Sequence, residues 1–511
     1  MSVLREHFDV LIIGAGLSGV GAAVTLRRDC PKRTYAILEA RDSMGGTWDL
    51  FRYPGIRSDS DMYTLGYSFR PWKDAKSLAD GASILKYIRD TASESRIDQH
   101  IRFQHCVTRA SWSSDEALWT VAVERGAQRQ QVEFTCSFLF TCTGYYSYAE
   151  GYSPLFPGAG RFTGTVIHPQ KWPTSLDYAG KRVIVIGSGA TAVTLIPAMA
   201  KSAAHVTMLQ RSPTYIVSAP NRDGVVNFLR DHLPETVAYR LVRWRNVLFG
   251  AAFYQLCRRY PLAIKNFILS GVRAALGPDF DVATHFTPRY NPWDQRMCLV
   301  PDGDLFDAIK AGSASVCTGE IETFTEHGIR LKSGQQLKAD IVVTATGLNV
   351  VVLGNMQLLV DGQTIDPAKT LSYKGCMYSG IPNLASTFGY TNASWTLKCE
   401  LTCNYVCRVL NYMERSGRDM CLPQNLDPSV QPETFLNLTS GYIQRAAEKL
   451  PMQGSKRPWK LYQNYFLDLL TFRFGAVDDG VLKFDTRRTP AASEVRHARK
   501  QLTLAAARSA H

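Results

Sequence analysis

Four residues near the start of the chain have the types and spacing of a dinucleotide-binding loop. Gly14, Gly16 and Gly19 form a G-x-G-x-x-G motif, and Glu39 lies 25 positions after Gly14. Such glycines permit a tight turn, a close approach of the backbone to a pyrophosphate, and close packing of the next helix on the strand. A carboxylate at this distance is placed to bind a ribose diol. We therefore predict that these four residues hold the first of two nucleotides.

The motif recurs in the second third of the chain, with a different charged residue after it. Gly187 and Gly189 are followed by a small Ala192, and Arg211 lies 24 positions after Gly187, with Ser212 beside it. A guanidinium at this place suits a phosphate on the ribose, and the Ser212 hydroxyl adds a contact, so NADP is expected more than NAD. The alternative is that Arg211 is a solvated charge at the end of a strand.

Both loops need a parallel strand before them and a helix after them. Apolar runs rich in β-branched residues predict such strands directly before each loop, at 8–13 and 182–186, and after the following helices, at 34–40 and 205–212. Two further strands, 138–144 and 340–347, each end in Thr-Gly, which suits chain crossings between two domains. Two dinucleotide sites in one chain usually serve electron transfer from a nicotinamide to a tightly held flavin. We therefore expect FAD in the first site and an α/β fold with two Rossmann-like dinucleotide-binding domains.

Two longer motifs give the chain a family resemblance. The segment GGTWDLFRYPGIRSD and the segment FTGTVIHPQKWP both match, in order and spacing, signatures of the Baeyer–Villiger monooxygenases. The matching positions are Gly45, Gly46, Trp48, Tyr53, Pro54, Gly55 and Asp59 in the first, and Phe162, Gly164, His168, Trp172 and Pro173 in the second. The chain resembles this family of class B flavoprotein monooxygenases over most of its length, and within it the ethionamide-activating subgroup.

The resemblance implies an activity and the residues that carry it. The family's reduced FAD reacts with O2 to a C4a-peroxide, which converts ketones to esters and oxidises sulfur compounds such as thioethers. Arg296, in NPWDQRMCL, matches the arginine that stabilises the peroxide, and Asp59 matches the carboxylate that holds this arginine. Trp48, like Asp59, belongs to the implied FAD site. Gln295 stands where related enzymes often have a lysine for the NADP phosphate, so NADPH binding depends more on Arg211.

The resemblance also implies that His168 and Trp172 link the cofactor site to the placement of the two domains, by hydrogen bonding and not as a chemical base. From the residues alone, the alternative is a histidine satisfied by neighbouring backbone and a tryptophan that fills a domain seam. We assign both residues the linking role.

The order of the motifs predicts the domain organisation. The FAD-binding domain would be discontinuous, with residues 1–148 and 349–511, and the NADP-binding domain would comprise 149–217 and 294–348. Residues 218–293 would form a helical insertion of several amphipathic helices. Its basic and aromatic face packs against the protein or, as the alternative, contacts a membrane surface through residues 225–275.

Composition bounds the function further. The 511 residues carry a formal net charge of +13 and twelve irregularly spaced cysteines, which indicate reduced thiols without a metal site. Cys399, Cys403 and Cys407 recur every four residues, as expected for a packed helix stripe. We expect a cytoplasmic enzyme, which would be peripherally membrane-associated if residues 225–275 contact a membrane. Its expected partners are NADPH, O2 and a small ketone or thioether, and no nucleic acid. Two alternatives remain: a flavin monooxygenase acting mainly on nitrogen or sulfur, and a basic nucleotide-binding or membrane-surface protein without oxygenase activity.

Overall fold

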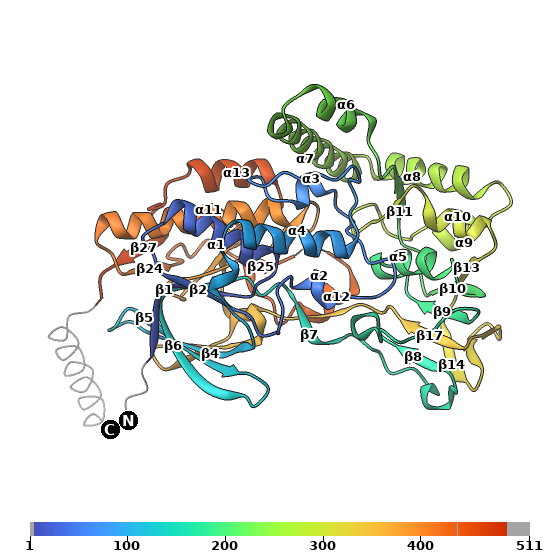
Figure 1. Ribbon diagram of the computed structural model, residues 1–511, viewed down its shortest axis with the longest axis horizontal. Helices are drawn as coiled ribbons and strands as arrows, with labels where there is room; N and C mark the ends of the chain where they lie inside the picture. The colour runs from blue at the N-terminus through green and yellow to red at the C-terminus, as the bar shows by residue number, and fades with distance from the viewer. Residues whose placement is uncertain (1–4, 437, 488–511) are drawn as a thin grey trace.

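Two β-sheets form the two halves of the molecule. The computed structural model describes residues 5–436 and 438–487. Within this part, the larger sheet has nine strands and the smaller has five, and the two sheets lie at opposite ends of the long axis (Figure 1). The parallel strands at the centre of the larger sheet are buried on both faces, on one side against helices and on the other against antiparallel strands.

The larger sheet is built around a parallel centre. β1 (Glu6–Ile13) lies between β2 (Tyr35–Leu38) and β6 (Gln130–Thr141) and runs parallel to both. β3 (Ile101–Arg102) and β23 (Leu384–Ser386) add further parallel pairs. An antiparallel meander of β4 (His105–Ser113) and β5 (Leu118–Arg125) joins β6, and β19 (Gln357–Val360) and β20 (Gln363–Ile365) close that edge. β1 contains the strand predicted at 8–13, and β2 covers residues 35–38 of the strand predicted at 34–40. The strand predicted at 138–144 is the last part of the longer β6, which ends at Thr141.

The first glycine motif makes the connection from β1 to α1 (Leu17–Asp29). Gly14 has a φ of 102°, which favours glycine. A Cβ at Gly19 would lie 1.8 Å from the carbonyl oxygen of Gly14, so α1 packs on the turn at a distance that any other residue would prevent. α1 also packs on α11 (Trp395–Ser416), where Cys399, Cys403 and Cys407 are buried free thiols, as expected for a packed stripe.

The smaller sheet is parallel throughout. Its order is β13 (Ala314–Thr318), β10 (His205–Gln210), β9 (Arg182–Ile186), β17 (Ile341–Thr344) and β8 (Thr165–Ile167). α5 (Ala190–Met199) follows β9 through the second glycine motif. β8 lies within FTGTVIHPQKWP, where no strand was predicted. Its β-branched Thr-Val-Ile run pairs with β17 and becomes an edge strand.

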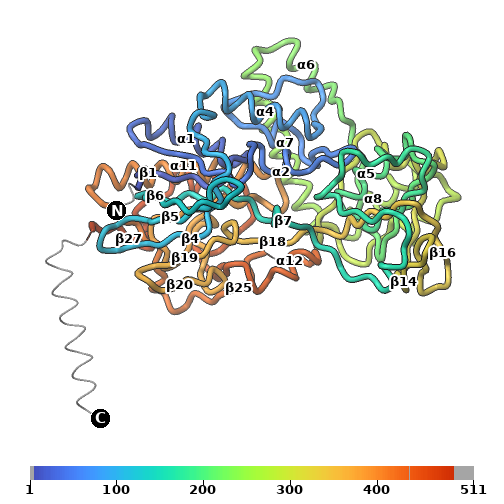
Figure 2. The backbone as a smooth tube through the Cα atoms, turned by 60° about the horizontal axis from the view of Figure 1, so that its bottom comes forward, coloured from blue at the N-terminus to red at the C-terminus, as the bar shows by residue number. Residues whose placement is uncertain are grey.

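Two chain crossings connect the halves. β7 (Tyr146–Gly151) leads from the larger sheet towards the smaller one, and β18 (Leu348–Val350) returns. They pair antiparallel and lie side by side between the sheets (Figure 2). The two crossings therefore form one ribbon and not two independent linkers.

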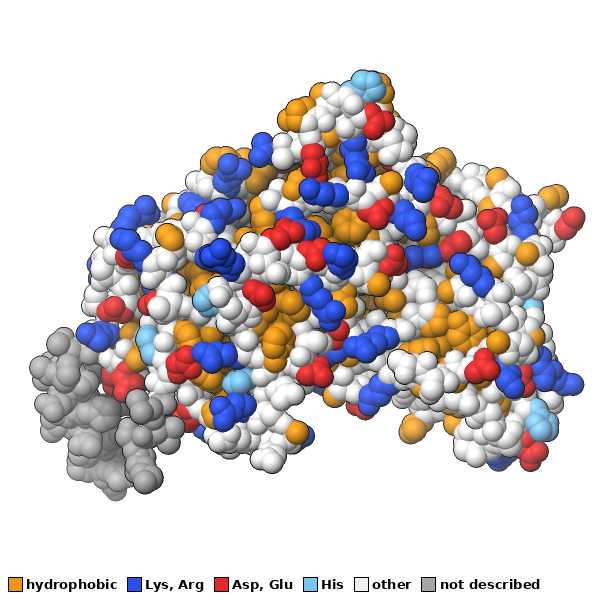
Figure 3. Space-filling view, in the orientation of Figure 1, with side chains coloured by type: hydrophobic (Ala, Val, Ile, Leu, Met, Phe, Trp, Pro, Cys, Tyr) orange, Lys and Arg blue, Asp and Glu red, His pale blue; other side chains and the backbone are white. Residues whose placement is uncertain are grey.

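Four helices occupy the segment where an insertion was expected: α6 (Gly224–His232), α7 (Glu235–Arg259), α8 (Pro261–Leu276) and α9 (Val282–Phe286). Of these, α6, α7 and α8 form the upper edge of the molecule, where hydrophobic and basic side chains both reach the surface (Figures 1 and 3). Among the described helices, none has the length and apolar character needed to cross a bilayer.

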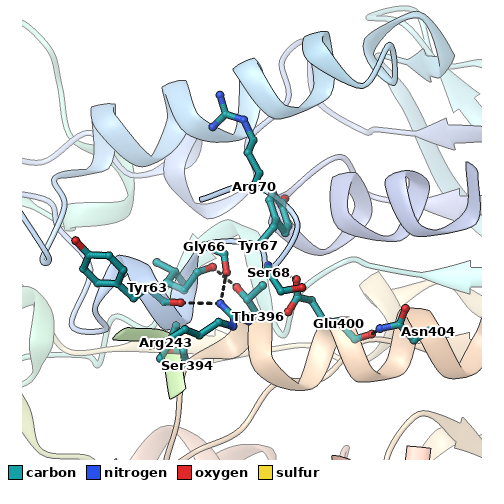
Figure 4. Close-up of polar contacts among 12 residues, drawn as sticks. Tyr63, Gly66, Tyr67, Ser68, Arg70, Arg243, Ser394, Thr396, Glu400 and Asn404 are labelled. Atoms are coloured by element: carbon teal, nitrogen blue, oxygen red, sulfur yellow. Dashed lines mark hydrogen bonds and ion pairs between the residues drawn. The ribbon is translucent and has the colours of Figure 1, made fainter. Parts of the chain in front are cut away.

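A buried arginine anchors the inner side of α7. Arg243 donates to the carbonyl oxygens of Tyr63 and Gly66, both at 2.7 Å, and pairs with Glu400 of α11 at 2.7 Å (Figure 4). Tyr63 lies within α3 (Met62–Leu65), and Gly66 directly follows it. α3 begins three residues after Asp59. Asn246, also on α7, donates to Asp61, the N-cap residue of α3. α7 therefore holds the short helix that follows Asp59.

The other α-helices and strands complete the described part of the fold. They are α2 (Thr47–Leu50), α4 (Gly81–Glu94), β11 (Ile216–Ala219), β12 (Cys298–Pro301), α10 (Asp304–Lys310), β14 (Ile321–Thr325), β15 (Gly328–Leu331), β16 (Gln336–Lys338), β21 (Ser372–Tyr373), β22 (Met377–Tyr378), β24 (Met420–Pro423), β25 (Pro432–Thr434), α12 (Gly441–Ala446), β26 (Met452–Gly454), α13 (Tyr465–Phe474) and β27 (Leu482–Asp485). The predicted domain boundaries stay predictions, and residues 1–4, 437 and 488–511 of the proposed FAD segments lie outside the described residues.

Candidate active site

A cavity of about 290 Å³ lies where the two glycine loops approach each other. Residues at the start of α1, Gly16–Ser18, and at the start of α5, Ala190 and Thr191, both line it. The first signature motif supplies another wall, comprising Gly45–Trp48, Phe51, Tyr53 and Ile56–Ser60, and a third wall comprises Tyr145, Tyr146, Tyr148, Arg296, Leu299, Leu348, Tyr390, Ala393 and Trp395. The cavity therefore brings together segments that are far apart in the sequence.

Arg296 and Asp59 meet at this cavity. The Arg296 Nη2 atom donates to Asp59 Oδ2 at 3.0 Å, although the residues are 237 positions apart. Both side chains line the cavity, and 37% of the Arg296 side chain and 31% of the Asp59 side chain remain exposed. The charge of Asp59 raises the pKa of Arg296 further above its usual value, against an opposing effect of burial. The structure thus holds a permanently charged guanidinium at the cavity wall.

Two tyrosines lie beside this ion pair, and no local sequence pattern predicts them. Tyr145 lies beside Arg296 and stacks on Trp395, with ring centroids 5.1 Å apart. Tyr442 also lies beside Arg296. Burial raises the pKa of both phenols, so they stay protonated near neutral pH. These residues come from a chain crossing and from α12, so no spacing rule links them to Arg296.

The first signature motif contacts both halves of the molecule. A Cβ at Gly55 would lie 2.7 Å from the carbonyl oxygen of Thr194 on α5, so this segment rests directly on the helix of the second glycine loop. Arg57 pairs with Asp304 of α10 at 2.5 Å. The stretch before Asp59 is therefore held against the smaller sheet by both packing and charge.

The predicted first nucleotide site has the features that a pyrophosphate requires. α1 begins at the cavity without a side-chain cap, so its first N–H groups have no side-chain acceptor, and no acidic residue lies in its first turn. These N–H groups fit an anion such as the FAD pyrophosphate. Glu39 follows β2, and its carboxylate accepts from the backbone N–H of Ala15 at 2.7 Å and of Arg41 at 3.0 Å. Burial raises the pKa of Glu39, and each of its oxygens keeps a further lone pair for a ribose hydroxyl.

The predicted second site has the same construction on the smaller sheet. Gly187 has a φ of 137°, and α5 likewise begins without a side-chain cap. Ser188 donates to the carbonyl oxygen of Ser212 at 3.3 Å, which places the Arg211–Ser212 pair beside the glycine loop. Arg211 is exposed at the end of β10, where a ribose phosphate can reach it.

His168 and Trp172 lie apart from the cavity lining. The Nε2 atom of His168 donates to the carbonyl oxygen of Gly347 at 3.1 Å, and its Nδ1 atom accepts from the N–H of Gln170 at 3.2 Å. A Cβ at Gly151 would lie 1.9 Å from the ring of His168. Since Gly151 ends β7 and Gly347 precedes β18, the imidazole lies between the two crossings. Trp172 packs half-buried against Tyr178 at the smaller sheet's core.

The structure thus brings Gly16, Trp48, Asp59 and Arg296 to one cavity and places Arg211, Ser212, His168 and Trp172 outside its lining. No group of three or more His, Cys, Asp or Glu residues in the described part of the chain is arranged to hold a metal ion.

Comparisons with known proteins agree on the family. The model of the family described as "FMO-like: Flavin-binding monooxygenase-like" matches residues 8–271. The chain is 54% identical over 488 residues to "FAD-containing monooxygenase EthA" of Mycobacterium tuberculosis (strain ATCC 25618 / H37Rv), covering 95% of this chain and 99% of that protein. A second relative, "Probable FAD-binding monooxygenase AlmA" of Acinetobacter baylyi, is 48% identical over 95% of this chain and 97% of its own length.

Solved structures share the fold. An open crystal structure of cyclohexanone monooxygenase superposes with a TM-score of 0.73 at 21% identity, covering 94% of this chain and 100% of that one. An oxidised steroid monooxygenase bound to NADP gives 0.71 at 22% identity with the same coverage. The predicted fold class is confirmed by these likenesses. The predicted FAD-containing monooxygenase is confirmed at the level of the family, and the alternative of a basic nucleotide-binding or membrane-surface protein without oxygenase activity is wrong. The chain belongs to the flavin-binding monooxygenase-like family.

Proposed function

We propose that the protein is an NADPH- and O2-dependent Baeyer–Villiger monooxygenase that converts ketones to esters and also oxidises sulfur compounds. The Arg296–Asp59 pair is the observation that carries this proposal, because it presents a fixed positive charge to a cavity between the two glycine loops. When bound, FAD would accept a hydride from NADPH and, once reduced, activate O2. The rest of the chemistry depends on what the chain holds around it.

Arg296 stabilises negative charge in this scheme. Attack on a ketone builds negative charge on its carbonyl oxygen, and a preorganised donor in a water-poor cavity stabilises that charge more than bulk water does. The guanidinium stays charged at any working pH and cannot discharge an anion by giving up a proton. Asp59 orients it through the 3.0 Å bond.

Apolar walls determine which substrates fit. Phe51, Ile56, Leu299, Leu348 and Ala393 line the cavity with the aromatic rings of Tyr145, Tyr390 and Trp395. Such a lining favours an apolar ketone or thioether whose polar oxygen or sulfur faces Arg296.

The nucleotides would be positioned by the two uncapped helices. The first turn of α1 would bind the FAD pyrophosphate, with Gly14, Gly16, Gly19, Glu39 and Trp48 around it. The first turn of α5 would bind the NADPH pyrophosphate, with Gly187 and Gly189 in the loop and Arg211 and Ser212 on the ribose phosphate. His168 would fix the ribbon of crossings that sets the distance between the two sites, with Trp172 as its packing support.

A product analysis under one set of conditions tests the proposal. The purified holoenzyme is given NADPH, isotopically labelled O2, and either a linear methyl ketone or a matched methyl thioether. We expect an ester that carries one labelled oxygen from the ketone, and a sulfoxide from the thioether. A sulfoxide without any ester from a panel of linear, cyclic and aromatic ketones would favour the alternative of nitrogen or sulfur oxygenation.

A further inference from the structure

Exposed apolar side chains concentrate on one group of helices. Among the described residues, eighteen large hydrophobic side chains are exposed, and eleven of them lie between residues 225 and 267. They are Val225, Phe228, Val237, Leu241, Trp244, Leu248, Phe249, Leu256, Tyr260, Leu262 and Phe267. Phe249, Leu262 and Phe267 are about 70% exposed, at 72%, 71% and 68%. We call the surface formed by these eleven residues the α6–α8 face. Soluble monomers seldom expose such a concentration of apolar side chains unless something binds there.

α7 is apolar on two opposite sides. Val237, Leu241, Trp244 and Leu248 are exposed and recur at intervals of four, three and four residues, which places them on one stripe of the helix. Ala238, Tyr239, Val242 and Val247 are buried on the other side. A helix that packs on one side and meets water on the other would carry polar residues along the outer stripe. The outer stripe of α7 is therefore suited to a second apolar environment.

Positive charge accompanies this stripe. From residue 236 to residue 276 the sequence contains no Asp or Glu, but it contains seven basic residues: Arg240, Arg243, Arg245, Arg258, Arg259, Lys265 and Arg273. Arg243 is buried and Arg258 pairs with Asp294 at 2.8 Å, while Arg240, Arg259 and Arg273 are exposed. Apolar and aromatic side chains with flanking arginines are the composition of helices that lie in the interface of an anionic bilayer.

The same helices form an outer layer of the active-site region. Val247 of α7 packs with Tyr390 and Leu397 in a small apolar cluster that also includes Ala393. Tyr390 and Ala393 line the cavity beside Arg296. Trp244, one helical turn before Val247, stacks on Phe466 of α13 with ring centroids 6.4 Å apart. One layer of side chains thus separates the outer stripe from the cavity wall.

We propose that the α6–α8 face docks on the surface of an anionic lipid bilayer. The exposed apolar side chains would enter the headgroup boundary, and the exposed arginines would bind lipid phosphates. The inference goes beyond the proposed function and does not depend on it.

Charge favours a bilayer over a second copy of the chain. A two-fold interface through the α6–α8 face would set the same mainly basic surface against itself. Between residues 225 and 267 the sequence has two carboxylates, Asp231 and Glu235, against seven basic residues, Arg230, Arg240, Arg243, Arg245, Arg258, Arg259 and Lys265. An anionic bilayer neutralises these arginines instead. The test must nevertheless measure both outcomes.

Vesicle co-sedimentation of the full-length holoenzyme tests the docking. The probes are vesicles of phosphatidylcholine alone and vesicles with equal parts of phosphatidylglycerol. The test variant is F249S/L262S/F267S, which replaces three exposed apolar side chains of the α6–α8 face with serine. Its matched control is F103S/L155S/L426S, which removes three exposed apolar side chains elsewhere. Sedimentation velocity without lipid, and retained FAD absorbance, establish oligomeric state and folding for each protein.

The expected result is binding of the parent protein to the anionic vesicles, at least ten-fold weaker binding to phosphatidylcholine, and a decrease when salt is raised. The test variant should lose at least ten-fold in partitioning, while the control variant binds as the parent does. Equal partitioning of the two variants would overturn the proposal. The proposal would also be overturned if the parent protein did not bind vesicles but formed an oligomer that F249S/L262S/F267S dissociates. The α6–α8 face would then join two copies of the chain. Turnover of a water-soluble ketone should be the same in all three proteins. A parent protein that binds vesicles but does not turn over ketones would contradict the proposed function and leave the docking proposal standing.

Discussion

The positive charge of Arg296 is fixed at the cavity wall by one carboxylate, and its removal separates charge stabilisation from cofactor binding. In Arg296→Ala we expect ester formation to fall by about a hundred-fold to a thousand-fold, since one preorganised donor is worth about 3–4 kcal/mol in other enzymes. FAD should stay bound, because no predicted FAD contact is removed, and NADPH should be consumed with release of hydrogen peroxide. Ester yield, FAD absorbance and peroxide are measured together. Arg296→Lys, which keeps the charge, should retain more activity; parent-like ester formation in Arg296→Ala would show that another group supplies the cation.

At Arg211, the prediction concerns the choice between two coenzymes. Arg211→Ala should raise KM for NADPH by about ten-fold to over a hundred-fold, corresponding to roughly 1.5–3 kcal/mol for a charge-assisted contact, and leave KM for NADH nearly unchanged. Steady-state kinetics with both coenzymes measure it. Lys201→Ala removes an exposed charge at the end of α5 and is the control. An equal loss with NADPH and NADH would assign Arg211 to structure.

His168 lies between the end of β8 and the β7–β18 ribbon, and we expect this connection to depend on pH. Burial lowers the pKa of His168 below 6.5, so the ring is neutral at pH 7, with an acceptor at Nδ1 and a donor at Nε2. Because the folded-state pKa of His168 is lowered, the neutral ring's contribution to the stability of the fold is fully present above the unfolded-state pKa. That contribution is lost as pH falls through the folded-state pKa. Protonation of Nδ1 turns the acceptor for Gln170 into a donor.

We therefore expect the fraction of NADPH that yields product to fall as pH decreases below 6.5, with FAD still bound. His168→Ala should show a low fraction at every pH, and Gly151→Ala should resemble it, because the added Cβ would displace the ring. His327→Ala, an exposed histidine on the same half of the molecule, should keep the parent profile. Product and NADPH are measured from pH 5.5 to pH 8. Loss of FAD or of solubility in His168→Ala would support a purely packing role instead.

Arg243 is the inner counterpart of the exposed stripe of α7. Arg243→Met removes the donor to Glu400 Oε2 and to two buried carbonyl oxygens, while Glu400 Oε1 keeps the N–H of Ser68. Removing one member of such a pair costs about 3–5 kcal/mol, so the thermal midpoint of the holoenzyme should fall clearly. Arg240→Met, on the exposed side of the same helix, should leave it nearly unchanged. Similar midpoints for the two variants would mean that the Arg243–Glu400 pair contributes little.

Local elements were predictable from the sequence because their signals are local. The strands before and after the glycine loops are buried apolar runs, and Glu39 and Arg211 follow from strand ends. β8 was missed because three β-branched residues among turn residues become a strand only when β17 offers an edge. Tyr145, Tyr442 and the Arg57–Asp304 pair were missed because each depends on tertiary contacts between distant segments. The Arg296–Asp59 pair was expected only through the family resemblance.

At the scale of the whole molecule, the proposed function depends on how the two sheets are held across the cavity. The β7–β18 ribbon provides one connection, and the contacts of the first signature motif with α5 and α10 provide another. In the second connection, Arg57 is only 14% exposed and lies two residues before Asp59, while Asp304 begins α10 on the smaller sheet. This ion pair therefore joins the wall that carries Asp59 to the half proposed to bind NADPH.

Asp304→Asn tests this connection. The change removes the charge that neutralises Arg57 across the two halves, and the expected cost of roughly 1–2 kcal/mol corresponds to a rise in KM for NADPH of about five-fold to thirty-fold. FAD content should stay the same, because Asp304 lies outside the proposed FAD site. Asp307→Asn makes the same charge change on the exposed side of α10 and should behave as the parent. Steady-state kinetics and flavin absorbance of both variants provide the measurement. If Asp304→Asn and Asp307→Asn have the same KM, the halves are positioned by the ribbon and packing without help from this ion pair; if Asp304→Asn also loses FAD, the pair stabilises the larger sheet's site and not the placement of the smaller one.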